Sequence, residues 1–513
     1  MIRTSLALGA LLAFAVLRAN AAAAPSAEGL APLAAVPRYT LAPAAVADSR
    51  QAHPDKQHPY RYAVPVAAGL SPAAGQWEIV NGATAVWRLR IRSPGALSLS
   101  VKLSPLALPP GATLRITDPV SGFSQAPYTG SGLRRGGEWT PVILGDELLL
   151  EARMPAALKD QFSLGVPTVY HGYRDWKAAS VAPKSSGTCN INVACTEGDD
   201  WQREARSVAL ITIANQFLCS GELLNNVRQD RSALFVTANH CGIGTDENDS
   251  GPASSVNAYF NYQAATCNAT PRPQPALADT QGATLLADDV QSDFTLLRLS
   301  TTGTNRLPAN AYYAGWSALG QGSDSGVAIH HPSGDEKKIS VYGTALSESA
   351  ADIGQACPID AWQVQWSAGT TEPGSSGGGL WNASHHLIGT LSGGNASCDS
   401  PDGADYFARL DRGWTANASP THQLKAHLDP DGTCIAEIAG LDPQSNPNPS
   451  PITSGPTRCE GAASSCGTNG ITGGGAVTFL PGILLALVLR MLGFARYALS
   501  PAYGRKQPPD RLR

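Results

Sequence analysis

The sequence of 513 residues has few charged and few aromatic side chains, 15% and 7% of the total. Because long helices and coiled coils are rich in charged helix formers, this shortage excludes an all-helical or coiled-coil protein. Positive charge is not in excess either, since 37 basic residues stand against 41 acidic ones and the formal net charge is -4. Without a basic excess the chain has no means of attracting a phosphate backbone, so nucleic acid is not an expected partner.

Cysteine is missing from the long N-terminal part of the chain, and all 10 cysteines lie between Cys189 and Cys466. None of them forms a CxxC pair, which argues against zinc clusters and thioredoxin-like redox motifs. An even number of cysteines confined to one region indicates disulfides formed in an oxidising compartment. We therefore expect an exported protein that needs no metal and no cofactor.

Both ends of the chain have the composition of targeting signals. Residues 1–21 combine a basic start at Arg3, a short apolar core and the small-x-small motif Ala19-Asn20-Ala21, which predicts a cleaved signal peptide. Residues 476–513 follow three glycines and combine an apolar run with a basic end, as in some bacterial sorting tails. A membrane tail-processing protease is one predicted partner of this tail, and a retained anchor is the alternative. The expected location is secreted or at the bacterial cell surface.

Two β-rich regions are predicted between these signals. From about residue 60 to 173, alternating apolar and polar stretches punctuated by Pro and Gly predict a small antiparallel β domain. It has none of the residue types of a catalytic centre, so residues 22–184 are interpreted as a propeptide. In residues 185–441, short strands at similar spacing predict two small β-barrels with an active site in the crevice between them. Residues 442–475 are rich in Pro, Ser, Gly, Asn and Thr and are predicted to be a linker in which Cys459 pairs with Cys466.

Three segments of the second region carry the residue types of nucleophilic acyl transfer. They are Thr237-Ala238-Asn239-His240-Cys241, Ser292-Asp293-Phe294 and Gly374-Ser375-Ser376-Gly377-Gly378. A serine hydroxyl needs an imidazole to take its proton and a carboxylate to orient that imidazole, so His240, Asp293 and Ser376 are the predicted triad. The glycines permit a sharp turn that aims the N–H groups of Gly374 and Ser376 at one point, the predicted oxyanion hole. The chain order His, Asp, Ser is that of chymotrypsin-like proteases.

Further motifs extend the resemblance beyond the fold class to one family of proteases. The stretches 187–195, 237–242, 292–297 and 364–377, together with Ala328-Ile329-His330-His331-Pro332 and Glu336-Lys337-Lys338-Ile339-Ser340, look like the bacterial lysyl endopeptidases. This resemblance implies an all-β, chymotrypsin-like two-barrel domain behind a β-rich propeptide, secretion as a zymogen, and cleavage of proteins or peptides after lysine. It also implies three disulfides, Cys189–Cys398, Cys195–Cys267 and Cys219–Cys241, and leaves Cys357 and Cys434 to pair with each other.

Specificity for lysine needs a buried carboxylate that meets the ammonium of the substrate. Trypsin-like enzymes carry an Asp six residues before the nucleophile, where this sequence has Thr370, so the resemblance points instead to Asp405. The nearby Asp399 and Asp402 are competitors, interpreted as solvated loop residues.

The cleft is expected to be lined by Ser392, Gly393, Gly394 and Trp366. Ser392 stands where the family tends to carry a His stacked on the tryptophan, and a serine cannot stack. Cleavage after arginine or after a broader set of residues is therefore an alternative prediction. A non-catalytic, protease-like binding module is a third.

Activation cannot use the ion pair of trypsin-like zymogens, because the residue before the nucleophile is the uncharged Ser375. The bulk of the propeptide is therefore expected to act as an intramolecular inhibitor and chaperone. Lys184 lies five residues before Cys189, where the resemblance ends the propeptide. Self-cleavage between Lys184 and Ser185 is the predicted activating step.

Overall fold

The structure is a computed structural model that describes residues 29–46, 56–134, 136–174, 186–244, 251–269, 277–303, 305–355 and 357–460. The chain divides into two compact units, Met1–Gly467 and Thr468–Arg513, and every described residue belongs to the first. The predicted signal peptide, the Lys184–Ser185 bond, Cys466 and the predicted tail of residues 476–513 lie outside the described residues. Within the described ranges no helix is long and apolar enough to cross a membrane.

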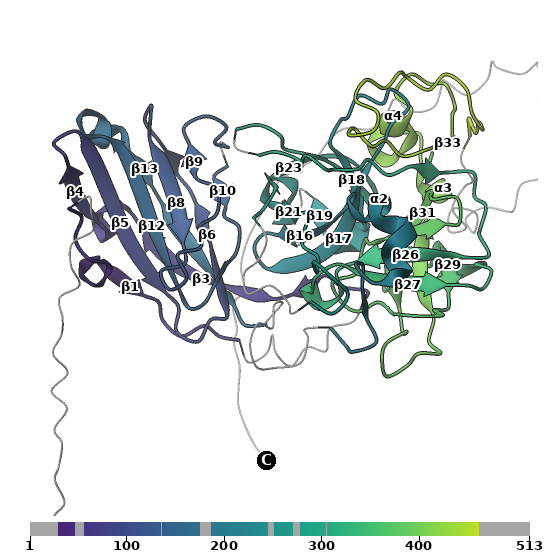
Figure 1. The fold of residues 1–513 in the computed structure, drawn as a ribbon, viewed down its shortest axis with the longest axis horizontal. Coiled ribbons are helices and arrows are strands. Elements are labelled where there is room, and N and C mark those ends of the chain that lie inside the picture. The colour runs from purple at the N-terminus through teal and green to yellow at the C-terminus, as the bar shows by residue number, and fades with distance from the viewer. Residues whose placement is uncertain are drawn as a thin grey trace, which may run out of the picture. The chain divides into compact units, whose positions relative to one another are not determined.

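The first region consists of two main β-sheets that share one apolar core (Figure 1). One sheet has the order β1-β5-β12-β8-β9, with β4 paired to β5, and the other has the order β10-β6-β14-β3, with β11 paired to β6. The strands are β1 (Arg38–Thr40), β3 (Ala63–Leu70), β4 (Gln76–Val80), β5 (Thr84–Arg92), β6 (Ser98–Leu103), β8 (Thr113–Thr117), β9 (Tyr128–Thr129), β10 (Glu138–Trp139), β11 (Ile143–Leu144), β12 (Glu147–Pro155) and β14 (Val166–Gly172). The short strands β7 (Leu106–Ala107) and β13 (Ser163–Leu164) pair with each other.

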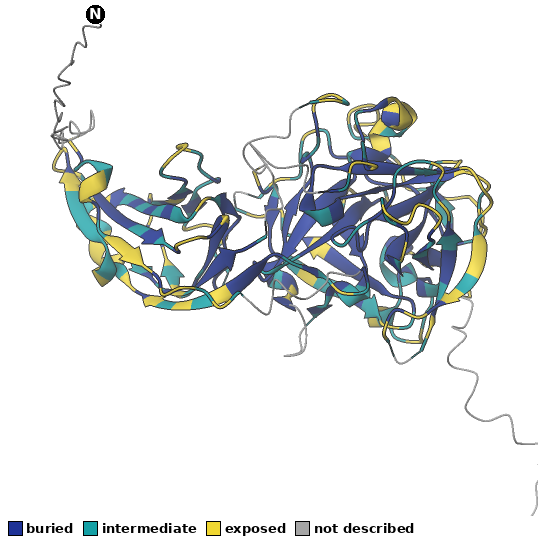
Figure 2. Cartoon of the chain, turned by 90° about the horizontal axis from the view of Figure 1, so that it is seen from below, coloured by how far each residue is buried: buried dark blue, intermediate teal, exposed yellow. Residues whose placement is uncertain are grey.

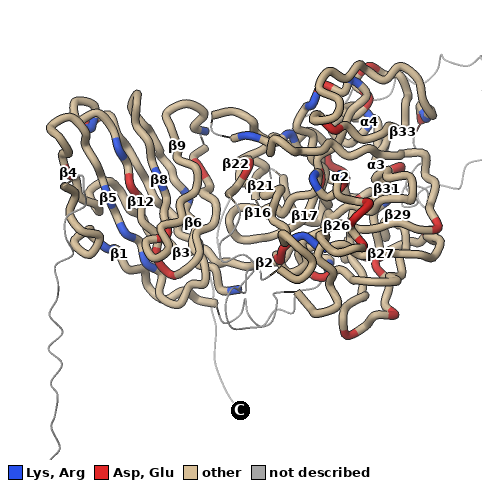
Figure 3. Tube along the Cα trace, in the orientation of Figure 1, with Lys and Arg blue, Asp and Glu red and all other residues tan. Residues whose placement is uncertain are grey.

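The alternation seen in the sequence is what fills this core. Along β12 every second side chain is buried, which Figure 2 shows as alternating dark blue and paler segments on the strands of this region. Charged residues of both signs lie along β5 and β12 (Figure 3). The arginines of β5 pair with acids on neighbouring strands and turns, such as Arg92 with Asp146 at 2.9 Å. The region begins earlier than the predicted start near residue 60, because β1 pairs in parallel with β5.

The second region contains an eight-stranded and a ten-stranded sheet. The first has the order β22-β21-β16-β17-β18-β24-β23, with β2 paired to β17. The first region contributes one strand to this sheet, β2 (Tyr60–Arg61). The other strands are β16 (Val208–Ile213), β17 (Phe217–Leu224), β18 (Leu234–Thr237), β21 (Asn257–Tyr259), β22 (Thr280–Gln281), β23 (Ala283–Asp289) and β24 (Phe294–Leu299).

The ten-stranded sheet has the order β15-β27-β26-β30-β31-β32-β29-β28, with β25 and β33 off this path. Its strands are β15 (Ile191–Asn192), β25 (Trp316–Ser317), β26 (Gly326–His330), β27 (Lys338–Tyr342), β28 (Ser347–Ala351), β29 (Ile359–Val364), β30 (Gly379–Asn382), β31 (Leu387–Gly394), β32 (Asp405–Arg409) and β33 (Glu437–Ile438). Three short helices, α2 (Gln202–Ala205), α3 (Leu410–Gly413) and α4 (Lys425–Leu428), accompany the two sheets.

A continuous core joins the two sheets of the second region. It includes Val236 and Leu296 from the first sheet and Ile339 and Trp381 from the second, all fully buried. The expected all-β fold is confirmed, because the described residues form sheets with few and short helices. The predicted triad is divided between these sheets, because His240 and Asp293 adjoin strands of the first and Ser376 precedes β30 of the second.

Four disulfides join described cysteines, and three of them are the pairs implied by the resemblance, Cys189–Cys398, Cys195–Cys267 and Cys219–Cys241. The fourth joins Cys434 to Cys459, so the predicted pairs Cys357–Cys434 and Cys459–Cys466 are wrong. The reason lies in the fold of the chain after Leu441. Residues 442–460 were expected to form part of a linker, but they follow the surface of the second region and carry Cys459 to Cys434.

Hydrogen bonds hold this segment in place, together with Ile452, which packs against the core of the second region. The amide of Ile452 donates to the carbonyl oxygen of Val227 at 2.7 Å, and Trp414 Nε1 donates to the carbonyl oxygen of Arg458 at 2.9 Å. The Arg458 guanidinium also lies 3.2 Å from a carboxylate oxygen of Asp411. The linker was therefore predicted to start too early. A low content of apolar residues indicates that a segment buries little surface, but it does not show whether the backbone of that segment forms hydrogen bonds.

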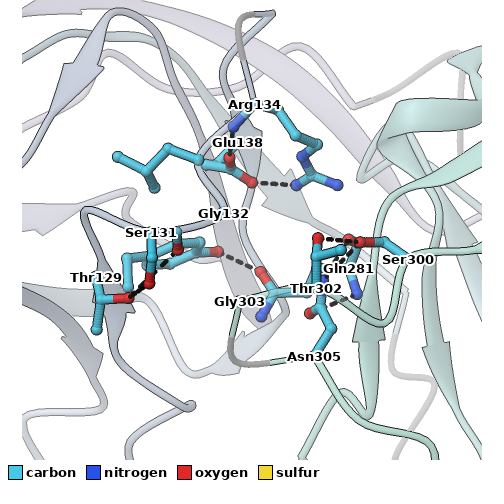
Figure 4. A pocket seen from close by; sticks show the side chains of 12 residues that line it. Thr129, Ser131, Gly132, Arg134, Glu138, Gln281, Ser300, Thr302, Gly303 and Asn305 are labelled. Carbon is cyan, nitrogen blue, oxygen red and sulfur yellow. Dashed lines mark hydrogen bonds and ion pairs between the residues drawn. The ribbon is translucent and has the colours of Figure 1, made fainter.

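The first region also contacts the second directly. Tyr60, Tyr62 and Trp139 belong to one apolar cluster with Leu218 and Tyr259 of the eight-stranded sheet. Nearby, Tyr128 donates its hydroxyl to Gln281 Oε1 at 2.6 Å, and Arg134 Nη1 donates to the carbonyl oxygen of Ser254 at 3.0 Å. Figure 4 shows side chains of both regions around the cavity at this contact. Its volume of about 20 Å³ suffices for a water molecule, so it is not a ligand site.

Candidate active site

Strand pairing brings His240 and Asp293 together. His240 lies in the turn after β18, Asp293 directly precedes β24, and these strands pair so that Thr237 lies opposite Thr295. The ring nitrogen Nδ1 of His240 lies 3.0 Å from Asp293 Oδ2 and 3.2 Å from Oδ1. The backbone amide of His240 also donates to Oδ1 at 2.8 Å, and Asp293 is fully buried. The carboxylate thus fixes both the backbone and the ring of the histidine, which leaves Nε2 for another partner.

Ser376 comes from the other sheet, in the turn before β30. Its carbonyl oxygen accepts from the amide of Ser220 at 2.8 Å, and Ser220 directly follows Cys219, the disulfide partner of Cys241. Gly377 in the same turn has φ +79°, and a side chain there would lie 2.4 Å from the carbonyl oxygen of Ser220. This close approach requires glycine and holds Ser376 beside the turn that carries His240.

Two backbone N–H groups of this turn are left without an acceptor. The amides of Ser375, Gly377 and Gly378 donate to carbonyl oxygens at 2.9, 2.9 and 2.8 Å. Among the described residues, the amides of Gly374 and Ser376 donate to none. Gly374 has φ +96°, a conformation that favours glycine. The two free donors are the pair expected of an oxyanion hole.

The residue before Ser376 takes part in a neutral contact. Ser375 Oγ lies 2.7 Å from His330 Nδ1, and His330 Nε2 lies 3.1 Å from Ser340 Oγ. Burial lowers the pKa of His330 to about 3, and the positive charges of Lys56 and Lys338 add to this effect. The imidazole is therefore neutral at neutral pH, and an uncharged pair stands where trypsin-like enzymes use an ion pair.

Asp405, the first residue of β32, is fully buried, and hydrogen-bond donors contact both of its carboxylate oxygens. Its Oδ2 accepts from Trp366 Nε1 and from Thr371 Oγ1, both at 2.7 Å. Its Oδ1 lies 2.6 Å from Nζ of Lys56, a residue of the first region. The same ammonium donates to the carbonyl oxygen of Ala396 at 2.5 Å. The competitors Asp399 and Asp402 are exposed.

The lysine that fills this pocket also reaches the predicted nucleophile. Ser376 Oγ donates to the carbonyl oxygen of Lys56 at 3.2 Å. His240 Nε2 is buried and has no hydrogen-bond partner among the described residues. The serine hydroxyl is therefore directed to the bound chain and not to the histidine. One lysine residue spans the distance between Asp405 and Ser376.

The remaining predicted cleft residues surround this lysine in different ways. A side chain at Gly394 would lie 2.3 Å from Asp405 Oδ1, so this position favours glycine, and one at Gly393 would lie 3.3 Å from Gln57 Cγ. Ser392 is buried at an irregularity of the β31–β32 pairing, and its hydroxyl has no partner among the described residues. Trp366 packs edge-on against Phe407 at 5.9 Å between ring centroids, so it does not depend on a stacked side chain at position 392.

Sequence reasoning named His240, Asp293, Ser376 and Asp405 but missed three members of the pocket. Thr371 carries no signal beyond its place near the nucleophile motif. Ala396 acts through its carbonyl oxygen, which no side-chain pattern reveals. Lys56 lies in a stretch without any motif, 349 residues before Asp405.

Comparison with protein-family models gives two matches that follow each other along the chain. A model described as lysyl endopeptidase N-terminal domain matches residues 40–173, and one described as lysyl endopeptidase, C-terminal domain, matches residues 183–408. A curated protein named lysyl endopeptidase from Pseudomonas aeruginosa is 31% identical over 296 residues. The match covers 53% of this chain and 60% of that relative, so it spans about three fifths of the relative's length.

Solved structures with a similar chain path are serine proteases. The active form of the Rv3671c protease from M. tuberculosis is 16% identical, with a TM-score of 0.29, and the match covers 45% of this chain and 89% of that one. The HtrA-type protease AlgW with a tripeptide is 19% identical, with a TM-score of 0.28, and the match covers 40% of this chain and 57% of that one.

Proposed function

The chain belongs to the lysyl endopeptidase family, and from this premise we propose that it is an exported serine endopeptidase that cleaves on the carboxyl side of lysine. The observation that carries the proposal is Lys56, whose ammonium meets Asp405 at 2.6 Å while its carbonyl oxygen lies 3.2 Å from Ser376 Oγ. A lysine is thus bound with its peptide group at the nucleophile. The disulfides of the second region favour export to an oxidising compartment.

The proposed reaction begins with attack of Ser376 Oγ on the carbonyl carbon that follows the bound lysine side chain. His240 Nε2 takes the hydroxyl proton, and Asp293 stabilises the resulting imidazolium and keeps its ring oriented. The oxyanion forms between the amides of Gly374 and Ser376, a contribution of about 3 kcal/mol per donor in comparable sites. The histidine then protonates the leaving amine, and water hydrolyses the acyl-enzyme by the reverse sequence of proton transfers.

The dimensions of the pocket favour lysine over arginine. The Lys56 ammonium makes short contacts with both Asp405 Oδ1 and the carbonyl oxygen of Ala396 when its backbone lies at the nucleophile. An arginine side chain is longer and ends in a planar guanidinium, which would have to displace one of these two acceptors. Asp405 cannot retreat, because its other oxygen is held by Trp366 and Thr371. Lysine is therefore the proposed substrate residue despite Ser392.

A peptide library digested with the mature enzyme tests this proposal. We expect cleavage after lysine to exceed cleavage after arginine by at least about tenfold, since arginine would lose one hydrogen bond of a charged group, a cost of about 1.5–3 kcal/mol. Reaction of Ser376 with a fluorophosphonate, lost in His240→Ala, tests the triad independently. Equal cleavage after both basic residues would contradict the specificity, and labelling that does not depend on His240 would contradict the mechanism.

A further inference from the structure

The uncleaved chain fills its own substrate pocket with Lys56. This lysine is buried to 5% exposure, and it is the side chain on which Asp405 Oδ1 and the carbonyl oxygen of Ala396 converge. Burial lowers the pKa of Lys56, and the adjacent Asp405 carboxylate opposes that shift. Lysine is almost never buried unless its charge is paired. The contact is therefore specific recognition of a lysine and not incidental packing.

The chain after Lys56 crosses from the ten-stranded sheet to the eight-stranded sheet, whose strand β18 leads to the histidine. Gln57 Nε2 donates to the carbonyl oxygen of Asp352 at 3.2 Å. The next pairing is that of β2, which runs antiparallel to β17 with Tyr60 opposite Leu218. Leu218 directly precedes Cys219, which is bonded to Cys241 next to His240. The lysine side chain thus lies with Asp405, and from Tyr60 on the chain runs beside the strand that leads to the disulfide next to His240.

Resting on the proposed function, we propose that the Lys56–Gln57 bond is a processing site that Ser376 of the same chain cuts first. Ser376 Oγ adds to the carbonyl carbon of Lys56 while His240 Nε2 takes the hydroxyl proton. The bond from that carbon to the nitrogen of Gln57 then breaks, and the nitrogen receives the proton from His240. Water hydrolyses the ester, which leaves a carboxylate on Lys56 and restores the hydroxyl of Ser376.

Two small movements separate the described geometry from the geometry that this reaction needs. The serine hydroxyl now donates to the Lys56 carbonyl oxygen, so it must turn to His240 Nε2, which has no partner among the described residues. The carbonyl oxygen must move to the amides of Gly374 and Ser376, which within the described ranges are unused donors. Both destinations are open. Until the bond is cut, Lys56 excludes every other lysine from the pocket.

The experiment follows the freshly folded full-length zymogen by intact mass and N-terminal sequencing. We expect a fragment that begins at Gln57 to appear at a rate that does not change over a tenfold dilution, because the reaction is intramolecular. In Lys56→Gln the rate should fall by about 30-fold or more, since one partner of a buried, hydrogen-bonded charge pair is lost. The matched control is Lys159→Gln, the same substitution at an exposed lysine of the same region, which should leave the rate unchanged. Ser376→Ala should give no such fragment.

The outcomes separate this proposal from the proposed function. Mature enzyme that cuts lysyl peptides, together with a zymogen that never yields a Gln57 terminus, would overturn the processing site and leave the function standing. A Gln57 terminus whose rate rises with zymogen concentration would overturn cutting within one chain. Enzyme that cuts no lysyl peptide at all would overturn both. A circular dichroism spectrum of Lys56→Gln matching that of Lys159→Gln shows that a lost fragment does not reflect misfolding.

Discussion

Replacement of the pocket carboxylate by its amide is the most direct test of the proposed recognition of lysine. Asp405→Asn keeps the volume of a fully buried side chain and removes only its charge. The amide has one acceptor oxygen and one donor nitrogen, whereas Asp405 accepts from Lys56, Trp366 and Thr371. If the amide oxygen serves Trp366 and Thr371, its NH₂ group faces the substrate ammonium, so one contact becomes donor against donor in either orientation.

The expected loss follows from that mismatch. Removing one partner of a buried, hydrogen-bonded charge pair costs about 2–5 kcal/mol. Since each 1.36 kcal/mol is a factor of ten in rate, kcat/KM for a lysyl peptide should fall by about 30-fold to several thousand-fold. A matched peptide with glutamine in place of lysine makes no such ion pair, so its low rate should change by about threefold or less.

The assay compares kcat/KM for the two peptides in wild type, in Asp405→Asn and in the control Asp402→Asn, which removes a charge from an exposed neighbour. Active-site titration with a fluorophosphonate normalises each preparation to reactive Ser376. A ratio of lysyl to glutaminyl cleavage in Asp405→Asn within about threefold of wild type would refute the assignment. Such a small change is typical of a solvent-exposed ion pair and not of a buried pair between Asp405 and the substrate lysine. A loss of fluorophosphonate reactivity would instead show damage to the nucleophile.

Three further predictions concern neighbouring features. Gly394→Ala should lower kcat/KM for lysyl peptides by about 100-fold, because the new methyl group would lie 2.3 Å from Asp405 Oδ1 and would shift the carboxylate; wild-type turnover would contradict this. Burial lowers the pKa of His330 to about 3 in the folded protein, whereas in the unfolded chain this histidine binds a proton below about pH 6.5. Its contribution to the free energy of unfolding of the Ser376→Ala zymogen should therefore fall by about 2 kcal/mol when the pH is lowered from 7 to 5. Urea titrations of a His330→Gln derivative should lack that part of the loss, and an equal pH dependence would exclude it. Cys459→Ser should cost about 3 kcal/mol by opening a loop of 25 residues, and non-reducing peptide maps of wild type should join Cys459 to Cys434; a peptide joining Cys434 to Cys357 would contradict the pairing.

The sequence could predict what depends on short segments. His240, Asp293 and Ser376 each stand at the end or the start of an apolar strand, and their types and order restrict the chemistry before any coordinates are known. The all-β class follows from alternation along strands such as β12, where burial alternates residue by residue. Asp405 required the family resemblance, because nothing in its immediate neighbours distinguishes it from Asp402.

What the sequence could not predict depends on long-range pairing. Lys56 meets Asp405 across 349 positions, and β1 joins β5 in parallel, so neither contact has a local pattern. The pairing of Cys434 with Cys459 was missed for a related reason. Residues 442–460 are held by hydrogen bonds to the second region, and a polar composition gives no sign of such bonds. Register between distant segments is set by the assembled surface and not by either segment alone.

The neutral contact between Ser375 and His330 restricts where inhibition of the zymogen can act. In trypsin-like zymogens a charged partner of the residue before the nucleophile assembles the site, but here Ser375 already bonds to a neutral imidazole in the uncleaved chain. The turn that carries Ser376 and its two free amides is therefore formed before processing. Under the proposed processing at Lys56, inhibition acts on access and not on assembly, through the occupation of the pocket by that lysine. Removal of that one side chain from the pocket should suffice to expose a site that is already built.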